Sequence, residues 1–199
     1  GACATPTTKL LVGTLAASGA LIVTASHNPA PWNGMKMVRG DGVFLNAAEG
    51  SLVAQIFESG DFRKGTSAAS RALSTPECNE PHLERILARV DIDRIRGAEL
   101  NVAIDYCNGV GSLLIPELMR ELGVRCHSIN AEPNGQFSRD PEPLPENMQQ
   151  LCAAVRERGA VAGFAVDPDG DRVALVDEGG HAVGEDYTLA LAVSVVAKR

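Results

Sequence analysis

The chain has 199 residues, a net charge of −7, 45% hydrophobic residues and 22% charged residues. This length and composition are typical of a folded globular protein with one large or two small domains. The acidic charge and the aromatic content of 4% argue against a nucleic acid or an anionic membrane as a partner. An anionic substrate would therefore need local positive charge, from a metal ion or from a few placed side chains.

Five cysteines are scattered along the chain, and the nearest two, Cys107 and Cys126, are 19 positions apart. No Cys-x-x-Cys metal or redox motif is present. Such an odd, scattered set predicts reduced, mostly buried thiols in a cytoplasmic protein. The longest apolar stretch, 10–25, is broken by glycine and serine and is a poor membrane span. The chain begins at Gly1 without a Met, so we expect a piece of a longer protein.

The first half of the chain predicts a helix, a strand, a hairpin and a second helix. Thr5 and Pro6 are typical of an N-cap followed by proline at the helix start, and Gly19 is typical of a helix end. The apolar, β-branched run Ala20–Ala25 predicts a buried strand that ends in a polar loop. The predicted elements are a helix over 5–18, a strand over 20–25, two short strands within 35–46 and a helix over 47–59.

The second half alternates strands with helices. Residues 62–80 and 134–147 are rich in polar residues and proline, which predicts loops. Between and after these loops, the sequence predicts helices over 81–90, 113–122, 148–158 and 186–198, and strands over 100–105, 161–166 and 173–177. Strands that alternate with helices predict a layered α/β fold.

The first motif whose residues could take part in catalysis is Thr24–Pro29, followed closely by Asn33–Lys36. A serine just past a strand is rigidly held yet exposed, so Ser26 suits a nucleophile. His27 and Lys36 could supply a proton acceptor and a cation beside it. An ordinary polar turn is the alternative, because Ser and Asn-Pro are common in turns, and this motif alone leaves both open.

The second motif is Asp167–Arg172, which places three carboxylates at alternating positions of a glycine-containing loop. Oxygen ligands converging in this way suit Mg²⁺, which keeps positions for water or a phosphate oxygen. Arg172 could bind the same phosphate through its guanidinium fork. An acidic surface turn between two strands is the alternative, which three aspartates directly after the apolar run 161–166 disfavour.

Two segments partly match known ligand-binding loops, but each lacks a residue that the loop requires. The acidic loop half-matches a calcium EF-hand, with Glu178 at the twelfth position, but Arg172 occupies the sixth position where glycine is needed, and strands flank it. Residues 108–112 partly match a dinucleotide-binding loop, but Leu114 stands at the third glycine position.

Together the two motifs resemble the α-D-phosphohexomutase superfamily, which includes phosphoglucomutase, phosphomannomutase and phosphoglucosamine mutase. Ile22–Met37 resembles its active-site serine loop, and Asp167–Arg172 resembles its metal loop. Weaker similarity covers 1–11, 108–111 and 133–151.

The resemblance implies an α/β fold with layered mixed sheets flanked by helices, as part of a multi-domain architecture. It implies that 1–95 are the C-terminal part of a first α/β domain with the serine loop. Residues 96–183 would then form a second α/β domain with the metal loop, and 184–199 the start of a third domain.

The resemblance also implies roles for single residues. Ser26 carries the phosphoryl group, and Mg²⁺ is bound by a phosphoserine oxygen and by three aspartates, Asp167, Asp169 and Asp171. His27 and Lys36 match positions linked to proton transfer and phosphate contact, and Arg172 matches the metal-loop arginine. Pro168 stands where the family often has glycine.

The reaction that this resemblance implies interconverts hexose 1-phosphate and hexose 6-phosphate through a hexose 1,6-bisphosphate intermediate. The form of the serine loop favours the phosphoglucosamine mutase or phosphomannomutase types. The oligomeric state is not readable from the sequence, and we expect the 199-residue chain to be inactive by itself.

Two other functions remain as alternatives. A haloacid-dehalogenase-like phosphatase would use Asp167 as the nucleophile of an Asp-x-Asp-Gly-Thr loop, but Asp171 replaces the threonine and Ser26 is left without a role. A sugar-phosphate- or metal-binding module without catalysis is the second alternative.

Overall fold

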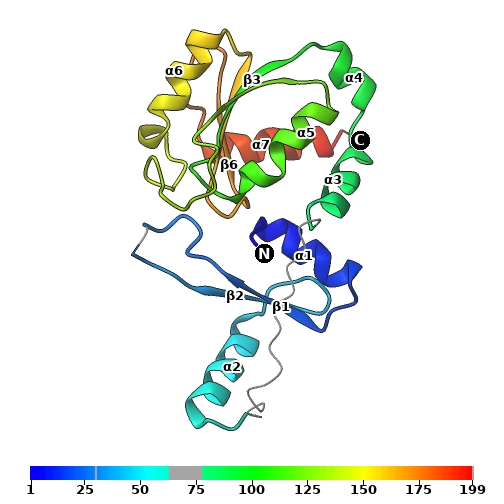
Figure 1. Cartoon of the computed structure of the whole chain (residues 1–199), viewed down its shortest axis with the longest axis vertical. Helices are drawn as coiled ribbons and strands as arrows, with labels where there is room; N and C mark the ends of the chain where they lie inside the picture. The colour runs from blue at the N-terminus through cyan, green and yellow to red at the C-terminus, as the bar shows by residue number, and fades with distance from the viewer. Residues whose placement is uncertain (30, 63–77, 199) are drawn as a thin grey trace.

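In the computed structural model of the protein, residues 1–29, 31–62 and 78–198 are described (Figure 1). They form two α/β units, a smaller one built from the N-terminal part and a larger one around a four-stranded sheet. Of the loop predicted over 62–80, residues 63–77 lie outside the described residues, and Glu80 already belongs to a helix. No helix within the described ranges is long and apolar enough to cross a membrane.

The smaller unit consists of a helix on a strand pair, with a second helix extending from it. Strands β1 and β2 are antiparallel, with Gly19 opposite Arg39 and Val23 opposite Met35. Helix α1 packs against both strands, and α2 extends away from the larger unit (Figure 1). The elements are α1 (Thr5–Thr14), β1 (Gly19–Val23), β2 (Met35–Arg39) and α2 (Ala47–Ser59).

The predicted helix over 47–59 has the bounds that the structure shows, because its start is strongly specified. The Asn46 side chain accepts a hydrogen bond from the Glu49 N–H at 3.0 Å, and Glu49 accepts one from the Asn46 N–H at 2.8 Å. This reciprocal capping box satisfies two donors that a helix start leaves free. Gly60, in the left-handed conformation, ends the helix.

Three predictions in the smaller unit are wrong. The first helix ends at Thr14 instead of Ser18, because Ala16 has a φ of 47° and cannot continue it. The strand predicted over 20–25 ends at Val23, and it is not buried: Leu21 and Val23 are 56% and 65% exposed. Within the described residues it pairs only with β2. The second strand of the predicted hairpin is reduced to one bridge, between Val38 and Phe44.

The larger unit contains a mixed sheet with the order β4-β3-β5-β6. Strands β4, β3 and β5 are parallel, and β6 is antiparallel to β5. The strands are β3 (Asn101–Asp105), β4 (Arg125–Ile129), β5 (Ala162–Val166) and β6 (Val173–Val176). The helices are α3 (Glu80–Leu87), α4 (Ile92–Gly97), α5 (Ile115–Glu121), α6 (Gln149–Arg158) and α7 (Glu185–Val196), with short 3₁₀ turns at Val110–Leu113 and Pro145–Asn147.

Helices cover both faces of this sheet, so the layered α/β fold is confirmed (Figure 1). Successive residues of β3 point to opposite faces. Ala103 packs with Leu151 and Val155 of α6 on one face. Val102 and Ile104 pack with residues of α5 on the other face. Because β3, β4 and β5 are parallel, their carboxyl ends lie at one edge of the sheet. The loops that follow these strands turn toward the smaller unit (Figure 1).

Two elements of the larger unit were not predicted. Strand β4, with the sequence Arg-Cys-His-Ser-Ile, is a half-exposed edge strand whose polar residues give no apolar run. The short helix α4 is started by Asp91, whose side chain accepts a hydrogen bond from the Arg94 N–H. The expectation of mostly buried cysteines is also wrong: all five lie in the described part as free thiols, and of these only Cys107 is buried.

Candidate active site

The serine loop follows β1 and places Ser26 in an uncommon backbone conformation. Its φ is 54°, in the left-handed region that few non-glycine residues adopt. The Ser26 N–H donates to the Thr24 hydroxyl at 2.9 Å, and the Asn28 side chain donates to the Ala25 carbonyl at 2.9 Å. The loop therefore holds its own turn. The Nδ1 atom of His27 lies 3.4 Å from the Ser26 hydroxyl oxygen.

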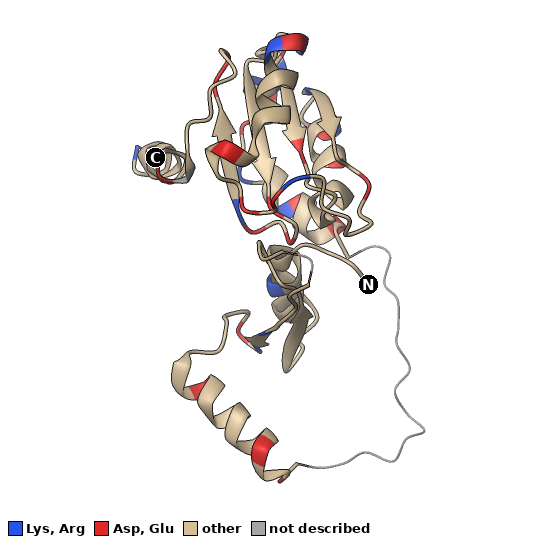
Figure 2. Ribbon diagram, turned by 90° about the vertical axis from the view of Figure 1, so that its left-hand side faces the viewer, with Lys and Arg blue, Asp and Glu red and all other residues tan. Residues whose placement is uncertain are grey.

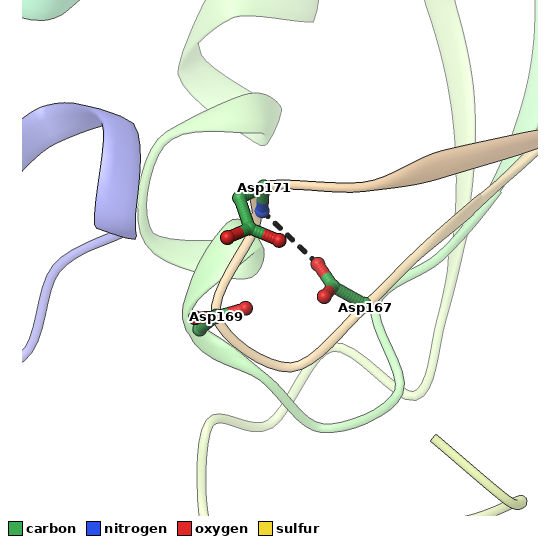
Figure 3. A group of neighbouring side chains, drawn as sticks. All are labelled: Asp167, Asp169 and Asp171. Carbon is green, nitrogen blue, oxygen red and sulfur yellow. Dashed lines mark hydrogen bonds between the residues drawn. The ribbon is translucent and has the colours of Figure 1, made fainter. Parts of the chain in front are cut away.

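The acidic loop connects β5 to β6 and brings its three carboxylates together (Figure 3). One oxygen from each of Asp167, Asp169 and Asp171 lies within 4.8 Å of the others. The loop curls because Gly170 has a φ of 71°. The same carboxylate oxygen of Asp167 accepts hydrogen bonds from the Asp171 N–H at 3.0 Å and the Arg172 N–H at 3.1 Å.

The other oxygen of Asp167 is buried and has no hydrogen-bond partner among the described residues. Burial, together with the negative charge of Asp169, raises the pKa of Asp167 to about 7. A buried carboxylate without a partner is costly. Three carboxylates that can each offer an oxygen ligand at this spacing, one of them with an unpartnered oxygen, fit a hard divalent cation such as Mg²⁺.

The serine loop and the acidic loop meet, although they are 143 positions apart in the sequence. The Ser26 hydroxyl donates to Oδ1 of Asp169 at 3.2 Å. Lys36, on β2, donates through Nζ to Oδ2 of Asp169 at 2.7 Å and to Oδ2 of Asp171 at 2.9 Å. The charged loops at this edge of the larger unit face the smaller unit (Figure 2).

The ionisation of these groups follows from their contacts. Burial alone would lower the pKa of Lys36, but its hydrogen bonds to Asp169 and Asp171 outweigh burial and raise the pKa. Burial alone would likewise raise the pKa of Asp169, but hydrogen bonds from Lys36 and Thr5 lower it. Lys36 and Asp169 are therefore both charged around neutral pH.

Thr5 contributes to this site, which sequence reasoning did not predict. Its hydroxyl donates to Oδ2 of Asp169 at 2.8 Å, and its N–H donates to the Asp169 carbonyl at 2.8 Å. The sequence predicted Thr5 as the N-cap of α1, but Ala4 is the N-cap and Thr5 is the first helical residue. The first N–H groups of a helix have no partner within the helix, so that of Thr5 is available to the acidic loop. No local signal marks this contact.

Arg172 is placed differently from the other predicted residues. Its backbone binds Asp167, but no hydrogen bond of its side chain is found within the described residues. Arg172 lines a cavity of about 530 Å³ together with Lys9, Phe44 and Asp171. The structure therefore brings Ser26, Lys36 and the three aspartates together and keeps His27 beside Ser26, whereas, in the part of the chain that is described, the Arg172 guanidinium makes no hydrogen bond to this cluster.

The glycine-containing loop after β3 supports the acidic loop. A Cβ atom at Gly109 would lie 2.5 Å from the backbone of Pro168, so only glycine allows this approach. The Val110 N–H donates to the Pro168 carbonyl at 2.9 Å. The partial match to a dinucleotide-binding loop thus reflects a packing requirement at the acidic loop.

A cavity of about 520 Å³ adjoins Ser26. Ser26, Trp32 and Asn33 line it from the smaller unit, and Asn108 and Phe137 line it from the larger one. Its volume lies within the range of small-molecule sites. Ser26 therefore lines a cavity that is large enough for a small ligand.

Both units match models of one protein family. Residues 1–64 match phosphoglucomutase/phosphomannomutase, alpha/beta/alpha domain I, and residues 80–180 match phosphoglucomutase/phosphomannomutase, alpha/beta/alpha domain II. The chain belongs to the phosphoglucomutase/phosphomannomutase family. The family resemblance is thereby confirmed, which favours this family over the haloacid-dehalogenase-like alternative. The domain limits at 95 and 183 stay a prediction.

Individual relatives agree with this assignment. The chain is 36% identical over 199 residues to a phosphoglucomutase/phosphomannomutase of Thermococcus kodakarensis, covering 100% of this chain and 44% of the relative. It is 39% identical over 189 residues to a phosphopentomutase of the same organism, covering 94% of this chain and 41% of the relative.

A solved structure shows the same fold. A protein of Thermus thermophilus described as a phosphomannomutase superposes with a TM-score of 0.85 at 26% identity, covering 100% of this chain and 45% of that one. The chain thus spans less than half the length of the relatives it matches.

Proposed function

We propose that the whole protein is a Mg²⁺-dependent phosphohexomutase that interconverts hexose 1-phosphates and 6-phosphates through a phosphoserine at Ser26. The observation that carries this proposal is the contact of the Ser26 hydroxyl with Asp169, inside a cluster of three carboxylates and Lys36. A serine alone is a weak nucleophile, but a serine held beside fixed charges can carry a phosphoryl group.

The proposed reaction has two phosphoryl transfers. In the first, the bond from phosphorus to Oγ of phospho-Ser26 breaks while a bond to a hexose hydroxyl oxygen forms, which gives the 1,6-bisphosphate. In net terms one proton moves from that hydroxyl to Oγ. In the second transfer the other phosphate of the bisphosphate returns to Oγ, and the sugar oxygen that it leaves regains the proton.

The side chains around Ser26 suit this chemistry. His27, 3.4 Å from Oγ, lies where it can hand a proton to Oγ as the phosphoryl group leaves and take it back on return. Lys36 supplies fixed positive charge beside the transferring group. Asp167, Asp169 and Asp171 would hold Mg²⁺, which when bound neutralises charge on the phosphoryl oxygens. We keep Arg172 as a phosphate contact, because it adjoins Asp171 and lines a cavity with it.

The choice of sugar is expected to lie outside this chain. Relatives with similar identity over this stretch are named for hexose and for pentose substrates, so similarity over this stretch does not separate the two sugar classes. We propose a phosphoglucosamine or a phosphomannose/phosphoglucose substrate from the form of the serine loop, and a cytoplasmic location. We also propose that the 199-residue chain by itself is inactive, and steady turnover by it would contradict this.

Peptide mass mapping tests the phosphoserine. The whole protein is incubated with Mg²⁺ and a hexose 1,6-bisphosphate, in parallel with Ser26→Ala and with Ser59→Ala as a control on the exposed end of α2. We expect one phosphoryl group on the Ser26 peptide of the wild type and of Ser59→Ala, and none in Ser26→Ala. A phosphoryl group trapped on Asp167 would favour the phosphatase. An unmodified protein that still binds sugar phosphate would favour the non-catalytic module.

A further inference from the structure

A buried ion pair lies against the acidic loop, and neither of its residues belongs to the cluster around Ser26. Asp105 is the last residue of β3, and Arg139 belongs to the long loop after β4. The Nε atom of Arg139 lies 2.7 Å from Oδ2 of Asp105, and their side chains are 7% and 0% exposed. Burying two charges costs desolvation energy that their attraction often fails to recover. Stability alone therefore explains this pair poorly.

Both Nη atoms of Arg139 donate to backbone carbonyls, and one of these carbonyls directly precedes the acidic loop. Its Nη2 donates to the Val166 carbonyl at 3.0 Å, and its Nη1 donates to the carbonyls of Asp140 at 2.9 Å and Pro141 at 3.3 Å. Val166 is the last residue of β5 and directly precedes Asp167. The guanidinium therefore holds the peptide unit from which the first carboxylate of the loop extends.

Asp105 holds the loop after β3, which is a second segment that supports the acidic loop. Its Oδ1 accepts from the Cys107 N–H at 2.9 Å and from the Asn130 side chain at 3.0 Å. Cys107 and Asn108 have φ values of 51° and 54°, a conformation that non-glycine residues keep only when their surroundings impose it. These two residues lead to Gly109, which packs on Pro168 at the top of the acidic loop.

We propose that Arg139 and Asp105 are positioning residues that set the direction of the Asp167 carboxylate, so that Mg²⁺ affinity depends on them although neither belongs to the three-carboxylate cluster. The inference rests on the proposed function, because it takes the acidic loop as the Mg²⁺ site. Arg139 acts through its planar fork, which bonds a carboxylate and a carbonyl at once. A lysine cannot reproduce this geometry. Outer-shell partners of metal ligands commonly change metal affinity 10- to 100-fold when replaced.

Calorimetric titration of the whole protein with Mg²⁺ tests the inference. The variants are Arg139→Lys, which keeps the charge, and Asp105→Asn, which keeps the shape. Arg156→Lys is the matched control, because Arg156 also donates to a backbone carbonyl, that of Gly180, remote from the cluster. We expect Mg²⁺ affinity about 10- to 100-fold weaker in the first two variants and unchanged in the control. Mutase activity should return at saturating Mg²⁺ with the KM for sugar phosphate unchanged.

The outcomes separate this inference from the function on which it rests. If Asp167→Asn binds Mg²⁺ as tightly as the wild type, the acidic loop is not the metal site and the proposed function fails. If Asp167→Asn loses Mg²⁺ but Arg139→Lys and Asp105→Asn bind it within about twofold of the wild type, the positioning role is overturned. Circular dichroism checks folding first. If Arg139→Lys does not fold, Asp105→Asn carries the test, and failure of both to fold would make the pair a core element and overturn the inference.

Discussion

At the scale of single residues, Asp169 is where the two units meet. It accepts hydrogen bonds from Thr5 on α1, Ser26 after β1 and Lys36 on β2. Burial alone would raise the pKa of Asp169, but the hydrogen bonds from Lys36 and Thr5 lower it and keep this carboxylate ionised. Asp167 is the opposite case: it is buried, has one unpartnered oxygen among the described residues, and has a raised pKa. The two carboxylates therefore differ in pKa because burial dominates at Asp167 and hydrogen bonds from Lys36 and Thr5 dominate at Asp169.

Replacement of Lys36 should impair phosphoryl transfer more than folding. Lys36→Met removes the cation that bridges Asp169 and Asp171, so the carboxylates repel each other and the phosphoryl group loses a fixed positive charge. We expect kcat to fall about 10²-fold or more in steady-state assays of the whole protein. Lys9→Met, which removes a lysine that lies over the Phe44 ring, should change kcat little, and an equal loss in both variants would contradict the assignment.

Removal of the Asp167 charge should stabilise the protein when Mg²⁺ is absent. The pKa of Asp167 is raised from 3.8 to about 7, so the folded chain binds this proton more tightly than the unfolded chain. Stability from this group is full below about pH 4 and is lost as the pH rises through about 7. In chelator, Asp167→Asn should exceed the wild type above pH 7 by on the order of 1–3 kcal/mol and match it near pH 4.

Urea unfolding at both pH values, with and without Mg²⁺, measures this difference. Mg²⁺ should stabilise the wild type and leave Asp167→Asn unchanged. A variant that is less stable than the wild type in chelator at pH 8 would show that Asp167 is satisfied without a cation.

At the scale of elements, the acidic loop depends on the loops at the ends of neighbouring parallel strands. The pairing of Val166 with Val173 holds its two ends. The loop after β3 supports Pro168 through Gly109 and Val110. Parallel strands bring such loops to one edge of the sheet, which is where α/β proteins place their sites.

A methyl group at Gly109 should displace the acidic loop. Gly109→Ala would place its Cβ 2.5 Å from the Pro168 backbone, and such overpacking costs about 1–3 kcal/mol. We expect lower stability and weaker Mg²⁺ binding together, measured by thermal unfolding and calorimetry. Gly50→Ala is the control: nothing lies within 4 Å of that position in α2, and alanine should stabilise the helix by about 0.5–1 kcal/mol. Wild-type Mg²⁺ affinity in Gly109→Ala would show that the support is dispensable.

At the scale of the whole molecule, the two units are connected through the site itself. Ser26 and Lys36 of the smaller unit contact aspartates of the larger one, and Thr5 adds two hydrogen bonds to Asp169. The proposed catalytic serine and metal ligands thus come together only when the units are together. Helix α2 takes no part, because it extends from the opposite side of the smaller unit (Figure 2).

Mg²⁺ should therefore protect both loops from hydrogen exchange at the same time. Binding to the folded state stabilises it by about 2.7 kcal/mol at a Mg²⁺ concentration of 100 times the Kd. Hydrogen-exchange mass spectrometry should show slower exchange at 24–29 and 167–172 on Mg²⁺ addition. The turn 177–181, held by Asp177 and His181, should not respond. Protection confined to 167–172 would contradict coupling between the units.

The amino-acid sequence by itself determined the features that depend on local patterns. The α/β layering follows from alternating apolar runs and helical segments, and α2 follows from its capping box at Asn46. The serine loop and the acidic loop are each contiguous, so their residue types and spacing marked Ser26 and the three aspartates as candidates. The resemblance to the phosphohexomutase superfamily implied that they form one site. The structure places these two loops in contact.

Only the tertiary structure decided the contacts that join distant parts of the chain. The contribution of Thr5, 164 positions before Asp169, and the buried pair of Arg139 with Asp105 have no local signal. Strand β4 forms because an edge strand is selected by pairing with β3 more than by its own polar sequence, and β1 is exposed because an apolar run is buried only where another layer covers it. Local patterns report the preferences of neighbouring residues, whereas hydrogen bonding and burial across the fold depend on which segments meet in space.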